Sequence, residues 1–307
     1  MLPGLLEPVM LPGLPRLEPD CLPSFVSEAN PGPYAWCSKS LLDQYKNLEK
    51  ADAVFVNSFH ELEPEEADYM TSTWRAKTIG PAVPSSYLDN RLPLDYHYGF
   101  DLQTPSTALC MQWLDNWPSN SVVYVSFGSI SALGPDQMVE LAFGLLNSDK
   151  RFLWVVRSLE ASKILENLVK DLSSERGLVV SWSPQTAVLS HKAVGCFLTH
   201  CGWNSTLEGI SLGVPMIGVP QWTDQPMNAK YIEDVWKIGV RARTGENGLV
   251  GREEVERCVR VVMEGERSEE IRRNARKWRE LAKKSVGEGG SSDRNLAEFV
   301  ARYCSLE

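Results

Sequence analysis

The chain has 307 residues, of which 43% are hydrophobic and 23% charged, proportions that permit a buried core and exclude an intrinsically disordered protein. Its 31 Lys and Arg against 40 Asp and Glu give a net charge of −9, which argues against a surface that follows the phosphates of a nucleic acid. No apolar run approaches the ~20 residues of a membrane-spanning helix. The seven scattered cysteines fit reduced thiols, and we expect a cytoplasmic protein.

The first 117 residues combine irregular segments with a few predicted helices and strands. The first 35 residues are rich in Pro and Leu, which predicts an extended or looping segment without a helix. Residues 82–117 are expected to be a linker, because residues 82 to about 106 combine charges and prolines without periodicity. Between these segments, apolar spacing predicts helices Ser38–Glu49 and Glu61–Trp74 and strands Val54–Val56 and Lys77–Ile79.

Residues 118–286 are more regular, with short apolar runs separated by amphipathic helical patterns. This alternation is typical of an α/β domain, a parallel sheet with helices on both faces. Six strands are expected, at Val122–Phe127, Phe152–Val156, Leu178–Ser181, Cys196–Thr199, Met216–Val219 and Val240–Ala242. Helices are expected at Pro135–Leu146, at Ser205–Leu212 with Gly213 as its cap, at Gln225–Lys237, and three times after Arg252 with a break at Gly287–Gly290.

The loop after the strand at 178–181 carries Trp182 and Gln185. Ligands of parallel sheets bind beyond the carboxyl ends of the strands, and an exposed Trp there offers a flat face for a planar base, worth ~1–3 kcal/mol. Gln185 has both a donor and an acceptor for a pyrimidine edge. For this loop alone, the commoner arrangement is a Trp that packs a turn around Pro184.

The next strand leads through His200 into a helix. A turn of small residues at a helix amino terminus binds anions through free backbone N–H groups and the helix dipole. Asn204 or Ser205 is expected either to cap this helix or to donate to a diphosphate. Glu208 either closes a capping box or accepts hydrogen bonds from a ribose diol.

The following strand ends just before Asp224 and Gln225. A carboxylate beside an amide can bind adjacent sugar hydroxyls, although Asp224 is also a common N-cap residue. Three consecutive strand-end loops thus offer a base platform, a phosphate site and a hydroxyl-binding pair. Together they describe a nucleotide-sugar site.

Residues 182–225 carry a dense set of residues at fixed spacing: Trp182, Pro184-Gln185, Val188-Leu189, His191, Phe197, His200-Cys201-Gly202-Trp203-Asn204-Ser205, Glu208, Gly213-Val214-Pro215, Pro220 and Asp224-Gln225. This set resembles the signature box of the plant family 1 UDP-glycosyltransferases. The resemblance implies a GT-B fold with a partial amino-terminal acceptor domain at 1–81, the linker 82–117 and one complete Rossmann-like donor domain at 118–286. Residues 287–307 would form a helix that packs back towards the amino-terminal part.

The resemblance also implies roles for the nucleoside and sugar contacts. Trp182 would stack on uracil, Gln185 would bond the uracil or the ribose, and Glu208 would hold the ribose hydroxyls. Asp224 and Gln225 would bind the hexose. Gln at the last position of the box suggests UDP-glucose over UDP-galactose.

For the diphosphate, the resemblance implies binding by His200, Asn204, Ser205 and the backbone of Trp203, with Ser129 assisting. The family inverts the anomeric centre by direct displacement: a base deprotonates the acceptor, its oxygen attacks C1, and UDP leaves. Charge on the leaving diphosphate would be stabilised electrostatically. The sequence has no Asp-x-Asp motif, which fits a metal-independent enzyme without a cofactor. The acceptor would be a small acid, phenolic, thiohydroximate or terpenoid.

The family's catalytic base is a His in a Gly-His-x-x-Pro-like turn near the start of the amino-terminal domain. None of His60, His97, His191 and His200 lies in that context, so we expect the chain to keep the donor site and to lack the base. Two full Rossmann-like domains need ~400 residues, which indicates an amino-terminally truncated chain. Two hypotheses follow: a UDP-sugar-dependent transferase, or a catalytically inactive UDP-sugar-binding fragment or pseudoenzyme.

Other patterns are weaker. Gly209–Gly213 matches the Gly-x-Ser-x-Gly motif of hydrolases, but it lies in an expected helix instead of the required strand-to-helix turn. The Gly-x-Gly-x-x-Gly fingerprint of nicotinamide dehydrogenases is absent. The His and Cys residues between 191 and 201 do not have the spacing of a structural zinc site.

Overall fold

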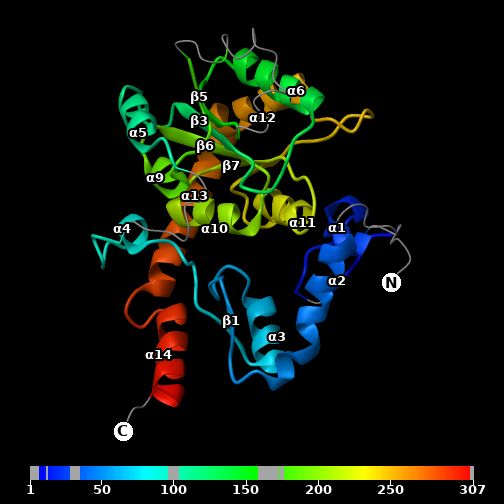
Figure 1. The fold of residues 1–307 in the computed structure, drawn as a ribbon, viewed down its shortest axis with the longest axis vertical. Helices are drawn as coiled ribbons and strands as arrows, with labels where there is room; N and C mark the ends of the chain where they lie inside the picture. Colours follow the sequence, from blue (N-terminus) through cyan, green and yellow to red (C-terminus); the bar gives the residue numbers. More distant parts are fainter. Residues whose placement is uncertain are drawn as a thin grey trace.

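Two parallel sheets, one of six strands and one of two, organise the part of the chain that the structure describes (Figure 1). The structure is a computed structural model that describes residues 7–11, 13–27, 35–95, 104–157, 172 and 176–304. Among the residues it describes, no helix combines the length and the apolar character needed to span a bilayer. The six-stranded sheet lies in the segment expected to be α/β, which confirms the fold class.

The six-stranded sheet has the order β5-β4-β3-β6-β7-β8 with all neighbours parallel. The chain runs outward from β3 to β5 and returns to β6 on the other side of β3. The switch point of the topology, where doubly wound sheets bind ligands, therefore lies between β3 and β6. All six expected strands are confirmed to within one or two residues: β3 Val122–Ser126, β4 Arg151–Val155, β5 Gly177–Val180, β6 Val194–Thr199, β7 Met216–Gly218 and β8 Gly239–Arg241.

Helices cover both faces of this sheet. Val123 and Val125 of β3 point into the core under α6 and α12, whereas Val122 and Tyr124 point into the core under α9, α10 and α13. This alternation follows from the two-residue period of a strand and explains why β3 is buried throughout. The covering helices are α6 Pro135–Asn147, α9 Gln185–Ser190, α10 Trp203–Leu212, α12 Arg252–Met263 and α13 Gly265–Val286.

The second sheet pairs β1 Val54–Val56 with β2 Ala76–Thr78 through the helix α3 Pro64–Trp74. It lies apart from the larger sheet in Figure 1. The parallel pairing and the intervening helix form one βαβ unit. Pro64 stands at the first helical position, where a missing N–H costs nothing, and α3 therefore begins three residues later than expected.

The last helix, α14 Ser291–Tyr303, packs against this two-stranded sheet. The side-chain amide of Asn295 donates to the backbone carbonyl of Thr78 at 2.8 Å. The rings of Phe55 and Phe299 meet edge to face with their centroids 4.8 Å apart. The carboxyl-terminal residues thus stabilise the sheet formed by residues 54–78.

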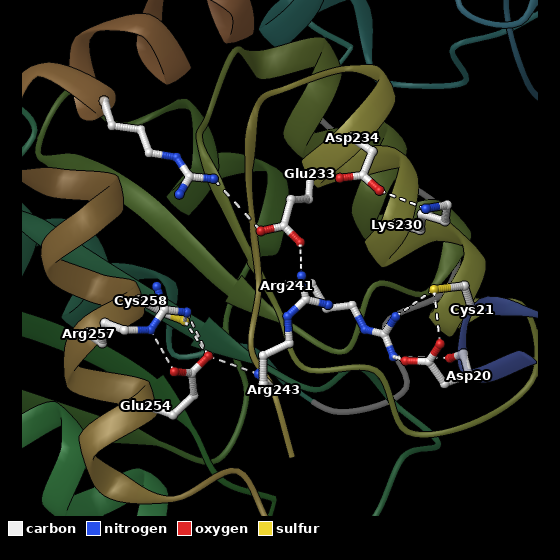
Figure 2. A network of polar contacts seen from close by, with 11 residues as sticks. Asp20, Cys21, Lys230, Glu233, Asp234, Arg241, Arg243, Glu254, Arg257 and Cys258 are labelled. Carbon is white, nitrogen blue, oxygen red and sulfur yellow. Dashed lines mark hydrogen bonds and ion pairs between the residues drawn. The ribbon is translucent and has the colours of Figure 1, made fainter. Parts of the chain in front are cut away.

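Figure 2 shows how the amino-terminal residues attach to the large sheet. The guanidinium group of Arg241, at the end of β8, donates to a carboxylate oxygen of Asp20 at 2.8 Å and to the sulfur of Cys21 at 2.7 Å. Next to it, Arg243 donates to Glu233 at 2.7 Å. The contacts of Arg241 join residues more than 200 positions apart in the chain.

The expectation that the first 35 residues hold no helix is wrong, whereas the expected linker at 82–117 stays a prediction and includes two short helices. The first 35 residues contain a 3-10 helix, η1 Pro19–Cys21, and a one-turn helix, α1 Ser24–Ser27. The expected linker contains α4 Ser85–Leu88 and α5 Thr107–Asp115. Cys110 and Leu114 are fully buried at i and i+4, an amphipathic pattern too short to stand out in the sequence. The domain limits themselves stay a prediction.

Helix ends differ elsewhere. The expected helix at 38–49 is α2 Ala35–Asp43 followed by a 3-10 helix, η3 Gln44–Lys50. The expected helix at 225–237 is α11 Gln225–Lys230 followed by a π-helix, η4 Tyr231–Val235. The wider π-turn, closed by a bond from the Trp236 N–H to the Tyr231 carbonyl at 2.8 Å, lets both aromatic rings point inward. The Gly213 cap and the three carboxyl-terminal helices with their break are confirmed.

Candidate functional site

The loops after β3 and β6 meet at the switch point, where His200 lies between two glycines. A Cβ atom added to Gly128 would lie 2.7 Å from Cε1 of the imidazole, and one added to Gly202 would lie 2.5 Å from Nε2. Gly128 also has a φ of +72°, a conformation that side chains other than glycine rarely adopt. The two glycines therefore let the imidazole lie directly against the backbone.

Helix α10 begins beside this imidazole. Gly202 is its N-cap and provides no side-chain cap bond, so the expectation that Asn204 or Ser205 caps the helix is wrong. The helix starts two residues earlier than expected, at Trp203, directly after the glycine that lies against His200. Its first backbone N–H groups, together with the helix dipole, form an arrangement that binds anions.

Burial lowers the pKa of His200 to about 4, and the nearby Arg157 acts in the same direction. The Asp224 carboxylate and a hydrogen bond with the backbone of Ser126 act against this lowering. The imidazole is therefore neutral at pH 7, with one ring nitrogen as a donor and the other as an acceptor. It can donate to an anion without carrying a fixed charge.

Ser129 lies exposed in the loop between β3 and α6. The guanidinium group of Arg157, which follows β4, donates to the backbone carbonyls of Ser129 and Ser131. The neighbouring strand therefore holds the shape of the loop that carries Ser129. Sequence analysis did not identify Arg157.

A polar cluster joins the loop after β5 to α10. The side-chain nitrogen of Gln185 donates to Oγ of Ser205 at 2.9 Å and to Oε2 of Glu208 at 2.8 Å. Glu208, only 3% exposed, is the sixth residue of α10 and lies beyond the N3 position of a capping box, so that alternative is wrong. Three of the expected site residues are thus in contact.

Trp182 is half-buried in the same loop. Its backbone carbonyl accepts a hydrogen bond from the N–H of Ser106 at 3.0 Å, at the start of α5. This bond fixes the backbone from which the indole projects. Stacking of the indole on a base stays a prediction.

The loop after β7 is closed by the side chain of Gln225. The amide oxygen of this buried residue accepts from the backbone N–H groups of Gln221 at 2.9 Å and Trp222 at 3.2 Å. The Oε1 atom is therefore used to shape the loop.

Asp224 stands at the N-cap position of α11 but makes no cap bond. Its carboxylate accepts from the hydroxyl of Thr223 at 2.8 Å and from the amide of Asn228 at 2.7 Å. Thr223 has a φ of +58°, unusual for a β-branched residue, and its backbone N–H and carbonyl both bond to Ser24 at 2.8 Å. The amino-terminal segment therefore holds this loop in a strained conformation.

Two further histidines pair with carboxylates. Nε2 of His60 lies 3.0 Å from Oδ1 of Asp68, and Nε2 of His191 lies 3.2 Å from Oδ1 of Asp115. The His60 and Asp68 side chains are 43% and 75% exposed. His97 lies outside the described residues, and among those described no three His, Cys, Asp or Glu side chains are grouped to hold a metal ion.

Comparison with known proteins decides the family. Residues 86–277 match the family model described as UDP-glucoronosyl and UDP-glucosyl transferase. The chain belongs to this family of UDP-glycosyltransferases. Crocetin glucosyltransferase 2 of Crocus sativus is 54% identical over 303 residues, covering 97% of this chain and 65% of the relative. UDP-glycosyltransferase 74E2 of Arabidopsis thaliana is 53% identical over 293 residues, covering 95% and 64%.

Solved UDP-glycosyltransferase structures share the fold. Os79 from O. sativa in complex with UDP matches with a TM-score of 0.89 and 52% identity, over 94% of this chain and 63% of Os79. Phytolacca americana UGT2, complexed with UDP-2fluoro-glucose and pterostilbene, matches with a TM-score of 0.83 and 35% identity, over 99% and 65%. The expected GT-B fold is thereby confirmed. The chain spans about 65% of the length of the curated relatives it matches.

In this UDP-glycosyltransferase chain, sequence reasoning missed residues that hold the expected site residues and their loops in position. Tyr124 lies in the centre of a buried strand and contacts Gln185 at 3.3 Å. The sequence feature that could have identified Tyr124 is its hydroxyl in an otherwise apolar run, since a buried Tyr needs a hydrogen-bond partner. Arg157 and Ser24 gave no signal, because their partners lie in distant loops.

Proposed function

We propose that this chain binds UDP-glucose and that the protein transfers the glucose to a small-molecule acceptor with inversion of the anomeric centre. The observation that carries the proposal is the arrangement at the switch point, where His200 lies between Gly128 and Gly202 beside the start of α10. Backbone N–H groups, a helix dipole and a neutral imidazole suit a diphosphate. The complexes of Os79 with UDP and of UGT2 with UDP-2fluoro-glucose support this choice of ligand.

The nucleoside would extend from the diphosphate towards the loop after β5. We assign uracil stacking to Trp182 and the ribose hydroxyls to Glu208, with Gln185 beside it. The bonds from Gln185 to Ser205 and Glu208 support this assignment, because they place the amide and the carboxylate in one cluster.

The hexose would lie at the loop after β7. We assign its hydroxyls to Asp224 and Gln225 and propose glucose over galactose. The Asp224 carboxylate opposes the lowering of the His200 pKa, and this interaction supports a hexose site next to the proposed diphosphate site. A hexose joined to the diphosphate would therefore be within reach of the loop.

Departure of UDP requires stabilisation of charge on the diphosphate. We assign it to His200, the side chains of Asn204, Ser205 and Ser129, and the backbone of Trp203, acting as preorganised donors. This assignment uses protein donors alone and needs no metal ion or other cofactor.

The group that deprotonates the acceptor is, we propose, none of the three described histidines. None of them follows a glycine in a Gly-His-x-x-Pro-like turn, and His200 belongs to the proposed diphosphate site. The acceptor classes we propose are small acids, phenolics, thiohydroximates and terpenoids. Solved complexes of Os79 with trichothecene and of UGT2 with pterostilbene support this choice, because both relatives bind small organic molecules.

Calorimetry and a transfer assay test the two parts separately. We expect UDP and UDP-glucose to bind the purified chain and UDP-galactose to bind more weakly. Absence of UDP binding would overturn the whole proposal. Formation of a glucoside from UDP-glucose and a phenolic or triterpenoid acceptor would establish transfer, whereas binding without turnover would leave a UDP-sugar-binding protein.

A further inference from the structure

We propose that Tyr124 is a positioning residue for ribose recognition, because its buried hydroxyl orients Gln185 and, through Gln185, the carboxylate of Glu208. The inference rests on the proposed function and deepens it, since a residue inside the sheet would position the side chains that contact the ribose. Tyr124 lies in β3, next to the switch point, and is 0% exposed. It therefore acts on a ligand only through other residues.

The phenol ring of Tyr124 is fixed by its neighbour on β6. Its ring stacks on that of Phe197 with the centroids 5.0 Å apart and the planes at 22°. Because both rings stand on adjacent strands of the central sheet, the hydroxyl at the tip of Tyr124 has a defined position. A buried hydroxyl of this kind needs hydrogen-bond partners.

The partners of the hydroxyl lie in the loop that begins α9. Oη of Tyr124 is 2.8 Å from Oγ of the buried Ser183 and donates to Oε1 of Gln185 at 3.3 Å. Burial raises the pKa of Tyr124, so the phenol keeps its proton and remains a donor. Ser183 can then donate to the phenol oxygen, which completes a chain of hydrogen bonds from the strand to the loop.

The orientation of the Gln185 amide follows from this chain. With Oε1 accepting from Tyr124, the Nε2 atom points to Ser205 and Glu208, at 2.9 and 2.8 Å. In a flipped amide the oxygen would face the Glu208 carboxylate, and because both groups are acceptors they could not form a hydrogen bond. Oε2 of Glu208 is therefore held in place, and the carboxylate has a fixed orientation for a ribose diol.

The test is calorimetric binding of UDP and of 2′,3′-dideoxy-UDP to the wild-type chain and to Tyr124→Phe. One hydrogen bond corresponds to about 3- to 10-fold in affinity. We expect Tyr124→Phe to weaken UDP binding by about that factor while changing dideoxy-UDP binding less than about twofold, so the preference for the ribose hydroxyls falls. A general disturbance of the sheet would weaken both ligands alike.

The matched control is Tyr231→Phe, which removes another buried hydroxyl, one that donates to Glu66 at 3.1 Å. It should leave the preference between the two ligands unchanged. In a Glu208→Gln background, Tyr124→Phe should have no further effect on the preference, because the two residues act in one chain. Ser183→Ala provides the same test with a smaller effect if Tyr124→Phe does not fold.

The outcomes separate the two proposals. The role of Tyr124 is overturned, and the proposed function stands, if the wild-type chain binds UDP and Tyr124→Phe keeps the full preference for UDP over dideoxy-UDP. The same holds if the variant loses affinity for both ligands equally. If the wild-type chain does not bind UDP, the proposed function fails first and the inference about Tyr124 fails with it.

Discussion

The two parallel sheets of this UDP-glycosyltransferase chain differ in how completely they are covered. All six residues of β6 and all five of β3 are buried between helices on both faces. β1 has no fully buried residue, and Phe55 at its centre is 40% exposed although α14 packs beside it. Apolar burial therefore stabilises mainly the sheet that carries the candidate donor site, whereas the β1–β2 unit depends on fewer contacts.

The two regions meet at the candidate site. The indole N–H of Trp203, the first residue of α10, donates to the backbone carbonyl of Asn57 at 2.7 Å, directly after β1. The comparison predicts that changes at the switch point alter ligand binding, that changes in the β1–β2 unit alter stability, and that Trp203 connects the two.

The largest effect on ligand binding is expected at Gly128. Gly128→Ala forces a left-handed backbone on a side chain, which costs ~1–2 kcal/mol, and it displaces the imidazole of His200. Loss of a hydrogen bond to a charged ligand should then lower UDP affinity by about 10- to 100-fold. Gly134→Ala in the same loop has open space around its new methyl group and should bind UDP normally in the same calorimetric titration. Equal UDP affinity of the two variants would contradict the assignment of the diphosphate site.

A pH-dependent effect on stability is expected from Glu63 in the smaller region. Burial raises its pKa to about 7, with the Glu66 carboxylate adding to the rise and a hydrogen bond from Ser58 opposing it. Because the folded state binds this proton more tightly than the unfolded chain, the contribution is fully present below about pH 4.5 and is lost as the pH rises through 7.

Glu63→Gln should remove the loss of stability that accompanies ionisation of Glu63. Its stability relative to wild type, measured by urea unfolding, should rise from near zero at pH 4.5 to at most about 3 kcal/mol at pH 8. Thr73→Ala, which changes an exposed side chain of α3 that does not titrate, should show no such trend. A difference that does not change with pH would rule out the buried carboxyl as its cause.

Phe299→Ala should destabilise the β1–β2 unit without affecting the donor site. It removes the edge-to-face contact with Phe55, and we expect a loss of about 1–2 kcal/mol in the free energy of unfolding. UDP affinity should stay within about twofold of wild type. Leu296→Ala, at an exposed position on the same helix, should cost less than about 0.5 kcal/mol. A parallel loss of UDP affinity in Phe299→Ala would show that the regions are not independent.

The smallest effect is expected for Trp203→Phe, which removes one hydrogen bond worth about 1 kcal/mol. Hydrogen exchange should show faster exchange of the amides around β1 and Asn57. Trp278→Phe also loses an indole bond, to the carbonyl of Trp236 at 3.0 Å, but within the larger region. It should leave β1 unchanged, and the same acceleration in both variants would argue against a specific connection through Trp203.

Much of the larger region could be predicted from the sequence because its strands are short apolar runs at regular intervals. The helices α1, α4 and α5 could not, since segments of four to nine residues show too few turns for a periodic signal. The site residues Gln185, Ser205 and Glu208 were recognised by type, and the structure shows their contacts. Tyr124 was missed because its partner Ser183 is 59 residues away, a contact that only the fold creates.

The most direct test of the donor site is a crystal structure of the chain with UDP bound. We expect the diphosphate within ~3 Å of the His200 imidazole and of the first backbone N–H groups of α10, and the uracil against Trp182. A diphosphate bound elsewhere, or a uracil that does not contact Trp182, would contradict the account.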